Sequence, residues 1–286
     1  MRPQKKVFCL TKRTGYDIIY VYKFLCERVL FMALIFDSHC HYDDSAFDDD
    51  RFALLDEMFD GKVGFLMHAS IDEKSALFGI DVSKRYENYY TSIGFHPENC
   101  GDTPDDFIKR LEALLPLSDK IKAVGEIGLD YHYEGYDRQK QIYIFEQQVE
   151  FANRHSLPVI VHSRNATEDT MEILNRHRPK GVMHCFSGSA ETAKEVISLG
   201  MYVGFTGVIT FKNSKKAKKA CAAAGKDRVL LETDCPYMAP EPYRGQRSDS
   251  RMCDKTAAAI GEIFGISPEE AIRLTSENAK RLFNIQ

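Results

Sequence analysis

Histidines and carboxylates recur near the carboxyl ends of short apolar segments along this chain. His39 and His41 are separated by one residue, so both side chains face the same side of an extended strand. Ionisable groups inside a fold are tolerated when they pair with each other or coordinate a metal ion. Imidazole with carboxylate suits Zn²⁺, Mn²⁺ or Fe²⁺, whereas Mg²⁺ prefers oxygen ligands and would be held less tightly. The candidate metal ligands are His39, His41, Glu126, His162, His184 and Asp234.

This set of ligands is too large for one tetrahedral site that keeps a position open for substrate. It suits two divalent ions that share a carboxylate. Two ions about 3.5–4 Å apart can activate water and hold both oxygens of an in-line phosphoryl displacement. The ligand set therefore predicts a metal-dependent hydrolase of phosphodiesters, with Asp234 as a general base that accepts the proton of the water.

The elements that must position these residues are apolar segments that alternate with longer amphipathic stretches. Such segments are typical of buried parallel strands, and the stretches between them are long enough for helices. Repeated strand–helix units predict an α/β fold of the (β/α)₈ TIM-barrel type, whose active site lies at the carboxyl ends of the strands. Two final helices are expected at 250–265 and 267–283, the second capped by Ser267. The predicted strands are 33–41, 62–70, 88–97, 121–130, 157–164, 181–188, 201–209 and 228–236.

Length and composition fit one such barrel. The chain has 286 residues, 44% of them hydrophobic, and a net charge of −4, so it is not a polycation that coats nucleic acid. We predict a single barrel domain over 32–286 and an N-terminal extension over 1–31 outside the fold. That basic extension is a poor candidate for a membrane helix or a signal peptide. A targeting segment and an upstream start codon both remain open as its origin.

The eight cysteines are expected to be reduced thiols, because the chain is long and contains no CxxC pair. Those that follow a candidate ligand in a strand are expected to face away from the metal. Reduced thiols favour the cytoplasm, with the nucleus or a mitochondrion as alternatives in a eukaryotic host. No membrane association is expected, and the oligomeric state is left open, a monomer included.

Several motifs resemble those of the TatD family of metal-dependent hydrolases, which includes deoxyribonucleases. The resemblance runs in order from about residue 34 to LFN near the C-terminus. The matching motifs are FDSHCHYD, GFHPE, AVGEIGLDYHY, PVIVHSRNA, HCFSGS, VITFKN and LLETDCPYMAP with the following YRGQR.

The resemblance implies roles for the candidate ligands. The HxH pair would bind one ion together with Asp234, and Glu126 would bridge to a second ion. His162 and His184 would complete the second site. The resemblance also implies two divalent ions (Mg²⁺, Mn²⁺ or Zn²⁺) as cofactors, and DNA as the partner, bound as single strands or 3′ ends. The implied activity is a 3′-to-5′ exonuclease.

One stretch departs from the family pattern. The chain has RGQRSDS at 244–250 where members often have RGKRNEP. Gln246 thus replaces a usual lysine, which weakens one expected phosphate contact. Arg164, Arg244 and Arg247 follow predicted strands and are candidates to hold phosphate through forked hydrogen bonds.

Further polar residues have weaker assignments. His96 is a candidate catalytic residue that contacts the scissile phosphate or the leaving oxygen, and the alternative is a role in orienting a ligand. Tyr131 and His132 are candidates for stacking on a base, with packing inside their loop as the alternative. His68 is expected to be structural, and Asp37 to orient a ligand or lie near the metals.

A lysine run follows the seventh predicted strand. It is either a solvated helix face or a contact for an acidic polymer at the barrel rim. The run consists of Lys212, Lys215, Lys216, Lys218 and Lys219.

Two other functions compete with a nuclease. A metal-dependent ester or amide hydrolase on the same barrel is the main alternative, such as an aminoacyl-tRNA deacylase or another amidohydrolase. Many amidohydrolases and phosphotriesterases bridge their ions with a modified lysine, in the region where this chain has Glu126. A non-catalytic binding protein on a retained barrel is the second alternative, and the complete ligand set argues against it.

Overall fold

The computed structural model describes residues 33–286, in which eight strands run parallel around a barrel. Each strand is hydrogen-bonded to the next in chain order, and a parallel bridge between Cys40 and Cys235 connects the two ends of the sheet. The predicted (β/α)₈ barrel is thereby confirmed, whereas the extension 1–31 lies outside the described residues and stays a prediction. The strands are β1 (Ile35–Cys40), β2 (Val63–His68), β3 (Tyr89–Ile93), β4 (Ile121–Asp130), β5 (Val159–Arg164), β6 (Gly181–Met183), β7 (Tyr202–Phe205) and β8 (Val229–Leu231).

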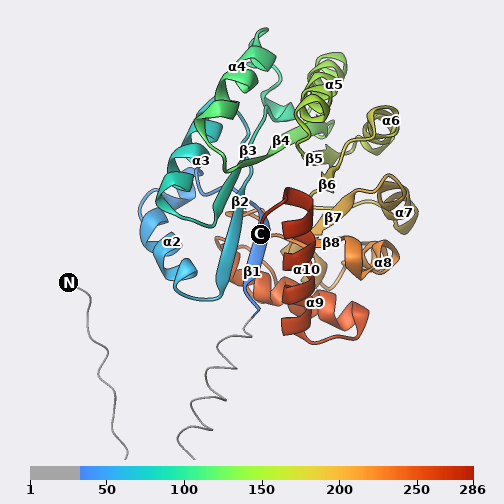
Figure 1. Cartoon of the computed structure of the whole chain (residues 1–286). Helices are drawn as coiled ribbons and strands as arrows, with labels where there is room; N and C mark the ends of the chain where they lie inside the picture. Colours follow the sequence, from blue (N-terminus) through green and yellow to red (C-terminus); the bar gives the residue numbers. More distant parts are fainter. Residues whose placement is uncertain (1–32) are drawn as a thin grey trace, which may run out of the picture. The chain divides into compact units, whose positions relative to one another are not determined.

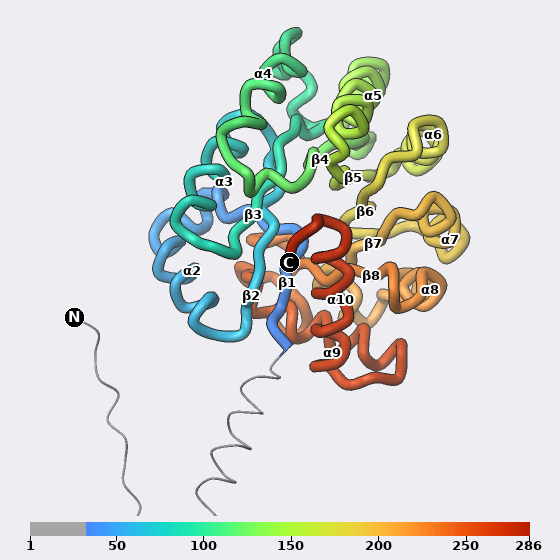
Figure 2. The backbone as a smooth tube through the Cα atoms, in the orientation of Figure 1, coloured from blue at the N-terminus to red at the C-terminus, as the bar shows by residue number. Residues whose placement is uncertain are grey.

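Helices α2 to α9 surround the strands in chain order (Figures 1 and 2). The last helix begins as predicted, since the side chain of Ser267 accepts the N–H of Glu270 and Pro268 occupies the first turn. Within residues 33–286, no helix combines the length and apolar character needed to cross a membrane. The helices are α2 (Arg51–Phe59), α3 (Glu73–Arg85), α4 (Phe107–Leu114), α5 (Arg138–His155), α6 (Thr167–His177), α7 (Ala190–Ser198), α8 (Lys215–Ala224), α9 (Cys253–Phe264) and α10 (Pro268–Phe283).

Apolar side chains fill the barrel interior toward the amino-terminal ends of the strands. Phe36 in β1, Ile160 in β5 and Leu230 in β8 belong to one buried cluster although their strands are spread around the barrel, so these side chains point toward its axis. Phe283 of α10 joins this cluster, and its ring centroid lies 6.0 Å from that of Phe36. In Figure 1, α10 crosses in front of the strands. It covers the amino-terminal end of the barrel and leaves the carboxyl end for the site.

Some strands are shorter than the sequence predicts. Strands β6 and β8 end well before the limits of the segments 181–188 and 228–236. Shortly after each strand, one residue lies in the left-handed backbone region, with φ of 41° at Cys185 and 62° at Asp234, so the chain there no longer follows an extended path. The segment 201–209 likewise leaves β7 early, in a 3₁₀ turn. The candidate ligands of β6 and β8 therefore lie in the loops directly after their strands.

Candidate metal centre

The carboxyl ends of the strands surround a pocket of about 810 Å³. Residues far apart in the sequence line it, among them His41 after β1, Glu126 in β4, His162 in β5 and Asp234 after β8. Parallel strands bring all their carboxyl ends to one end of a barrel, which is why these side chains meet. The structure brings all six candidate ligands into one cluster, whose triads of potential ligand atoms lie within 4.8 Å of one another.

Glu126 lies at the centre of the cluster, and its two carboxylate oxygens face different histidines. Oε2 is 3.2 Å from Nε2 of His39 and 3.6 Å from Nε2 of His41. Oε1 is 2.6 Å from Nε2 of His184 and 2.9 Å from Nδ1 of His162. The residue is buried, so these imidazoles rather than water surround its oxygens. One carboxylate thus connects two pairs of imidazoles.

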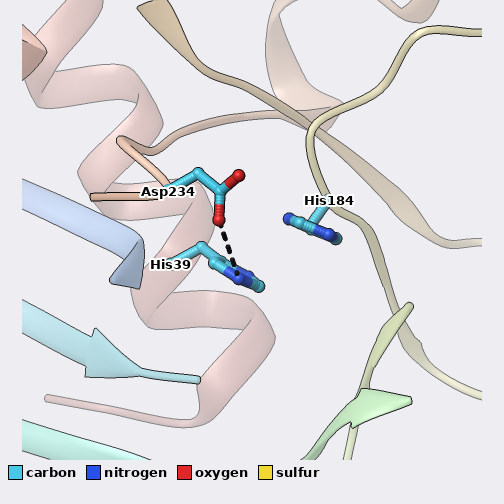
Figure 3. A group of neighbouring side chains, drawn as sticks. All are labelled: His39, His184 and Asp234. Carbon is cyan, nitrogen blue, oxygen red and sulfur yellow. Dashed lines mark ion pairs between the residues drawn. The ribbon is translucent and has the colours of Figure 1, made fainter. Parts of the chain in front are cut away.

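Asp234 completes the group around the first pair. Its Oδ1 is 3.6 Å from Nε2 of His39 and 3.3 Å from Nε2 of His41. Figure 3 shows this carboxylate beside His39, with the ring of His184 close by. The rings of His39 and His184 stack with centroids 3.9 Å apart and planes 11° from parallel. Two imidazole nitrogens and two carboxylate oxygens therefore converge on one side of the cluster.

Irregular pairing in two strands helps to aim these ligands. The register of β1 against β2 shifts between Asp37 and Cys40, and the register of β4 against β5 shifts between Val124 and Ile127. Irregularities of this kind re-aim side chains that strict alternation would place elsewhere. The two shifts span His39 and Glu126, so these ligands owe part of their direction to them.

Asp37 ties β1 to the segment that carries Asp234. Its Oδ1 accepts the N–H of His39 at 3.2 Å and that of Thr233 at 3.0 Å. Its Oδ2 accepts the hydroxyls of Thr233 and Ser250, both at 2.6 Å. Burial raises the pKa of Asp37 to about 6, although these hydrogen bonds act to lower it. Asp37 therefore positions the backbone around two candidate ligands.

Asp130, which sequence reasoning missed, lies behind His162. Its Oδ2 is 2.8 Å from Nε2 of His162, and its Oδ1 accepts the N–H of His132 at 2.8 Å. With Nε2 held by Asp130, Nδ1 is the nitrogen that faces Glu126, and a cation bound there would displace the proton of Nδ1. A carboxylate behind a histidine is the usual way in which proteins orient a metal-binding imidazole. The signal in the sequence is the Asp of GEIGLD. Its partner, His162, becomes visible only when β4 pairs with β5.

Glu232 is the second carboxylate that sequence reasoning missed, and it is fully buried behind His184. It accepts the N–H of Cys185, and its Oε1 lies 3.9 Å from Nδ1 of His184. Gly204 makes room for it, since a Cβ there would lie 2.1 Å from Oε2 of Glu232. Burial raises the pKa of Glu232 to about 8. The carboxylate is close enough to His184 to influence the orientation of that ring.

The crowded charges shift the pKa values of the imidazoles in opposite directions. Burial, with help from a neighbouring imidazole, lowers the pKa of His39 to about 4. Burial also disfavours the charged form of His41, but the hydrogen bond and charge of Asp234 outweigh it and raise the pKa to about 9. For His162, burial is outweighed by two hydrogen-bonded carboxylates, which raise the pKa to about 10. His41 and His162 therefore hold protons at neutral pH that a bound cation would displace.

The donor set fits divalent cations. Nε2 of His39 and Nε2 of His41 approach each other to 3.0 Å, and Nδ1 of His162 lies 3.2 Å from Nε2 of His184. Each nitrogen pair shares one oxygen of the same carboxylate. Mixed imidazole and carboxylate sites of this kind suit Zn²⁺ and Mn²⁺.

Comparison with known proteins identifies the family. Residues 36–284 match the model of the family described as TatD related DNase. The chain belongs to the TatD family. It is 36% identical over 258 residues to an uncharacterized metal-dependent hydrolase, YabD of Bacillus subtilis (strain 168), with 88% of this chain and 100% of that protein covered. It is 33% identical over 256 residues to YcfH of Escherichia coli (strain K12), also described as a metal-dependent hydrolase, with 87% and 95% covered.

A solved structure agrees with this assignment. The crystal structure of YJJV, a TatD homolog from Escherichia coli K12, matches with a TM-score of 0.83 at 29% identity, covering 88% of this chain and 98% of that chain. The protein is thus a metal-dependent hydrolase of the TatD family on a TIM-type barrel.

In this TatD-family barrel, His96 faces Glu126 from the loop after β3. Its Nε2 is 3.4 Å from Oε1 of Glu126, and its Nδ1 accepts the N–H of Glu98 at 3.2 Å. A neutral imidazole whose Nδ1 accepts a hydrogen bond carries its proton on Nε2. The Nε2–H of His96 is therefore a hydrogen-bond donor that faces the pocket.

Arg164 is the predicted phosphate-binding arginine that lines the pocket. Its guanidinium lies 5.3 Å from the ring centroid of Tyr133 and donates to the hydroxyl of that residue at 3.3 Å. The ion pairs found within residues 33–286 do not include Arg164. Its positive charge is thus available to a ligand in the pocket.

The other two predicted arginines lie differently. Arg247 forms a two-pronged ion pair with Asp50, at 2.8 and 2.6 Å, and is absent from the pocket lining. Arg244 lies over the ring of Phe211, 4.4 Å from its centroid, and Phe211 lines the pocket. The structure therefore places Arg244 near the rim and commits Arg247 to a carboxylate elsewhere.

The two predicted stacking residues do not line the pocket. Tyr131 donates to Asp169 at 2.6 Å and stacks on Tyr136, with ring centroids 4.6 Å apart. His132 is exposed, and its Nδ1 lies 3.4 Å from Nδ2 of Asn165. The contacts of Tyr131 are those of packing, with Tyr136 in its own loop and with Asp169 in α6.

Two further expectations concern residues close to the ligands. His68 is fully buried, and its Nε2 lies 3.2 Å from both oxygens of Ser75, as a structural residue would. The thiol of Cys40 donates to the carbonyl of Met67 on the outer side of β1. Cys185, in contrast, lines the pocket because its backbone is left-handed, so the expectation that it faces away from the site is wrong.

Sequence reasoning also missed an apolar wall of the pocket. It is built from the last residue of β7 and from the segments that follow β6, β7 and β8. A flat apolar wall beside a polar cluster can hold a ring while the cluster acts on an attached group. The wall consists of Phe186, Phe205, Val208, Ile209, Phe211 and Met238.

Proposed function

We propose that this TatD-family protein hydrolyses DNA phosphodiester bonds with two divalent ions, as a 3′-to-5′ exonuclease acting on single strands or 3′ ends. The observation that carries the proposal is the position of Glu126, whose two oxygens face separate pairs of imidazoles. When bound, Mg²⁺, Mn²⁺ or Zn²⁺ ions in this arrangement would lower the pKa of a water and neutralise charge that develops on phosphate. We assign the first ion to His39, His41 and Asp234, and the second to His162 and His184, with Glu126 between them.

Asp234 is the proposed general base. One of its oxygens faces His39, and the other points away from that ring (Figure 3). Its side chain is 14% exposed, so water from the pocket can reach it. The carboxylate can accept a proton from the attacking water and release it to solvent.

His96 is the proposed donor to the substrate. Because Nδ1 of His96 accepts the backbone N–H of Glu98, the ring proton is on Nε2 and points toward the cluster, where a phosphate would lie. A donor at that place can stabilise charge on a phosphate oxygen or protonate the leaving oxygen. We therefore assign His96 to the substrate, although its ring nitrogen also lies within 4.8 Å of potential ligand atoms of Glu126 and His162.

The pocket walls support a nucleotide as the bound unit. Arg164 offers an unpaired guanidinium to a phosphate, and the apolar wall that includes Phe186 and Phe211 offers surfaces for a base. A volume of about 810 Å³ is in the range of pockets for small ligands, so one end of a DNA strand is a better fit than a duplex.

The free thiols of the described cysteines support a cytoplasmic location.

Cleavage of labelled strands tests this function. Purified protein with Mg²⁺, Mn²⁺ or Zn²⁺ is incubated with single-stranded DNA labelled at the 5′ end, with duplex DNA and with D-aminoacyl-tRNA. We expect a ladder of products that shorten from the 3′ end, and a block when the last 3′ linkage is a phosphorothioate. Glu126→Gln is the inactive control.

Other outcomes would overturn the proposal. Internal cuts that ignore the 3′ block would refute exonuclease digestion. Deacylation of the tRNA without cleavage of DNA would assign the same centre to ester hydrolysis, which is the main alternative on this barrel.

A further inference from the structure

Helix α8 borders the pocket and carries a dense set of positive charges. It follows β7 and the 3₁₀ turn that forms part of the apolar wall. Its sequence, KKAKKACAAA, contains no acidic residue. We call the lysines of α8, together with one lysine in the segment just before it, the α8 lysines: Lys212, Lys215, Lys216, Lys218 and Lys219.

None of the α8 lysines forms an ion pair within residues 33–286, and only Lys219 is close enough to a carboxylate, that of Glu191 in α7, to interact with its charge. Within the part of the chain that the structure describes, the lysine ion pairs are those of Lys84 with Asp81 and Lys255 with Asp254. Clustered like charges repel each other, so such a set is unfavourable for folding unless solvent or a ligand compensates it. Most of this positive charge is therefore available to an anionic partner.

The α8 lysines are continuous with the pocket. Lys216 itself lines the pocket, together with Asn213 and Ala217. Lys219 lies one turn further along the same side of the helix, because residues three apart are neighbours on a helix surface. Next to this end of the pocket, Arg244 rests on Phe211 and takes part in none of the ion pairs of residues 33–286. The positive charge thus runs from the pocket lining outward along α8.

We propose that the α8 lysines bind the phosphate backbone of a single-stranded polynucleotide whose end occupies the pocket. This inference rests on the proposed function and adds the path of the strand outside the metal centre. Lysine ammonium groups are point charges that recognise phosphate without reading sequence, which suits an enzyme that must accept each successive linkage. A free nucleotide would reach Lys216 at most, whereas a longer strand would also reach Lys212, Lys215 and Lys219.

The salt dependence of binding tests this path. The variant Lys212→Gln/Lys215→Gln/Lys219→Gln removes three charges and leaves the pocket-lining Lys216. A matched control is Lys62→Gln/Lys180→Gln/Lys226→Gln, which removes three exposed lysines next to the amino-terminal ends of β2, β6 and β8, on the opposite end of the barrel.

Binding is measured by fluorescence anisotropy with a labelled phosphorothioate strand of about 20 nucleotides, which resists hydrolysis. Each lost phosphate contact to a single strand lowers the slope of log affinity against log salt by about 0.7, so the α8 variant is expected to lose about 2 from the slope. The control is expected to keep the wild-type slope. At low salt, the strand should bind the α8 variant at least tenfold more weakly, while a dinucleotide should lose less than the strand does.

Several results would overturn the proposal. An α8 variant with the slope of the control, a wild-type protein that does not bind the strand, or an equal loss for the dinucleotide would each refute it. Polyglutamate of equal length that binds as tightly would reassign the lysines to acidic peptides. Failure of the proposed function is distinguishable: the wild-type protein would then bind the strand with the expected slope and cleave no phosphodiester.

Discussion

Replacement of Asp130 by alanine is expected to weaken one metal site and spare the other. In the structure, Oδ2 of Asp130 is 2.8 Å from Nε2 of His162, and this contact directs Nδ1 toward Glu126. Loss of such an outer partner reduces metal affinity by about 10- to 100-fold, or about 1.4–2.7 kcal/mol. The group around His39 faces the other oxygen of Glu126 and has no contact with Asp130, so its affinity should stay within about twofold of wild type.

Isothermal titration of chelator-treated protein with Zn²⁺ or Mn²⁺ measures both affinities. Asp130→Asn should lie between wild type and Asp130→Ala, because the amide oxygen can still accept the proton of His162. Asp169→Asn is the control, since its carboxylate binds Tyr131 and Arg138 and no candidate ligand. If Asp130→Ala binds both metal ions with the affinities of the wild-type protein, the orienting role of this carboxylate is refuted.

Three further predictions follow from the geometry of the cluster. Glu126→Gln should lower kcat by at least about a hundredfold and reduce the metal content measured by mass spectrometry; normal content with a normal rate would contradict the bridging role. Because carboxylates raise the pKa values of His41 and His162 to about 9 and 10, metal binding at pH 7 should release protons. Affinity should rise with pH until about pH 9 at the site of His41 and until about pH 10 at the site of His162. Titrations in buffers of different ionisation enthalpy measure this release, and an affinity independent of pH would oppose it. Gly204→Ala places a Cβ 2.1 Å from Oε2 of Glu232. This clash should lower the free energy of unfolding by about 1–3 kcal/mol and Tm by several degrees. An unchanged Tm would show that Glu232 can move aside without loss of stability.

Patterns in the sequence were sufficient for the barrel and for the set of candidate ligands. Apolar segments at regular spacing report strands because burial acts on each segment locally, and parallel strands must gather their carboxyl ends. The HxH pair, Glu126 and Asp234 could be chosen for that reason alone, since they are polar residues at the ends of apolar runs. The predicted segments extend past the ends of β6 and β8, because the turn of the backbone at left-handed residues such as Asp234 leaves no clear local signal.

Only the tertiary structure decided which partners each of these side chains meets. Asp130 reaches His162 because β4 pairs with β5 in one register, and no local pattern encodes that register. Arg247 and Arg164 look alike in the sequence, yet one is bound by Asp50 and the other faces the pocket. Local sequence determines which elements form and where their ends gather, whereas the direction of a polar side chain depends on contacts between segments far apart in the chain.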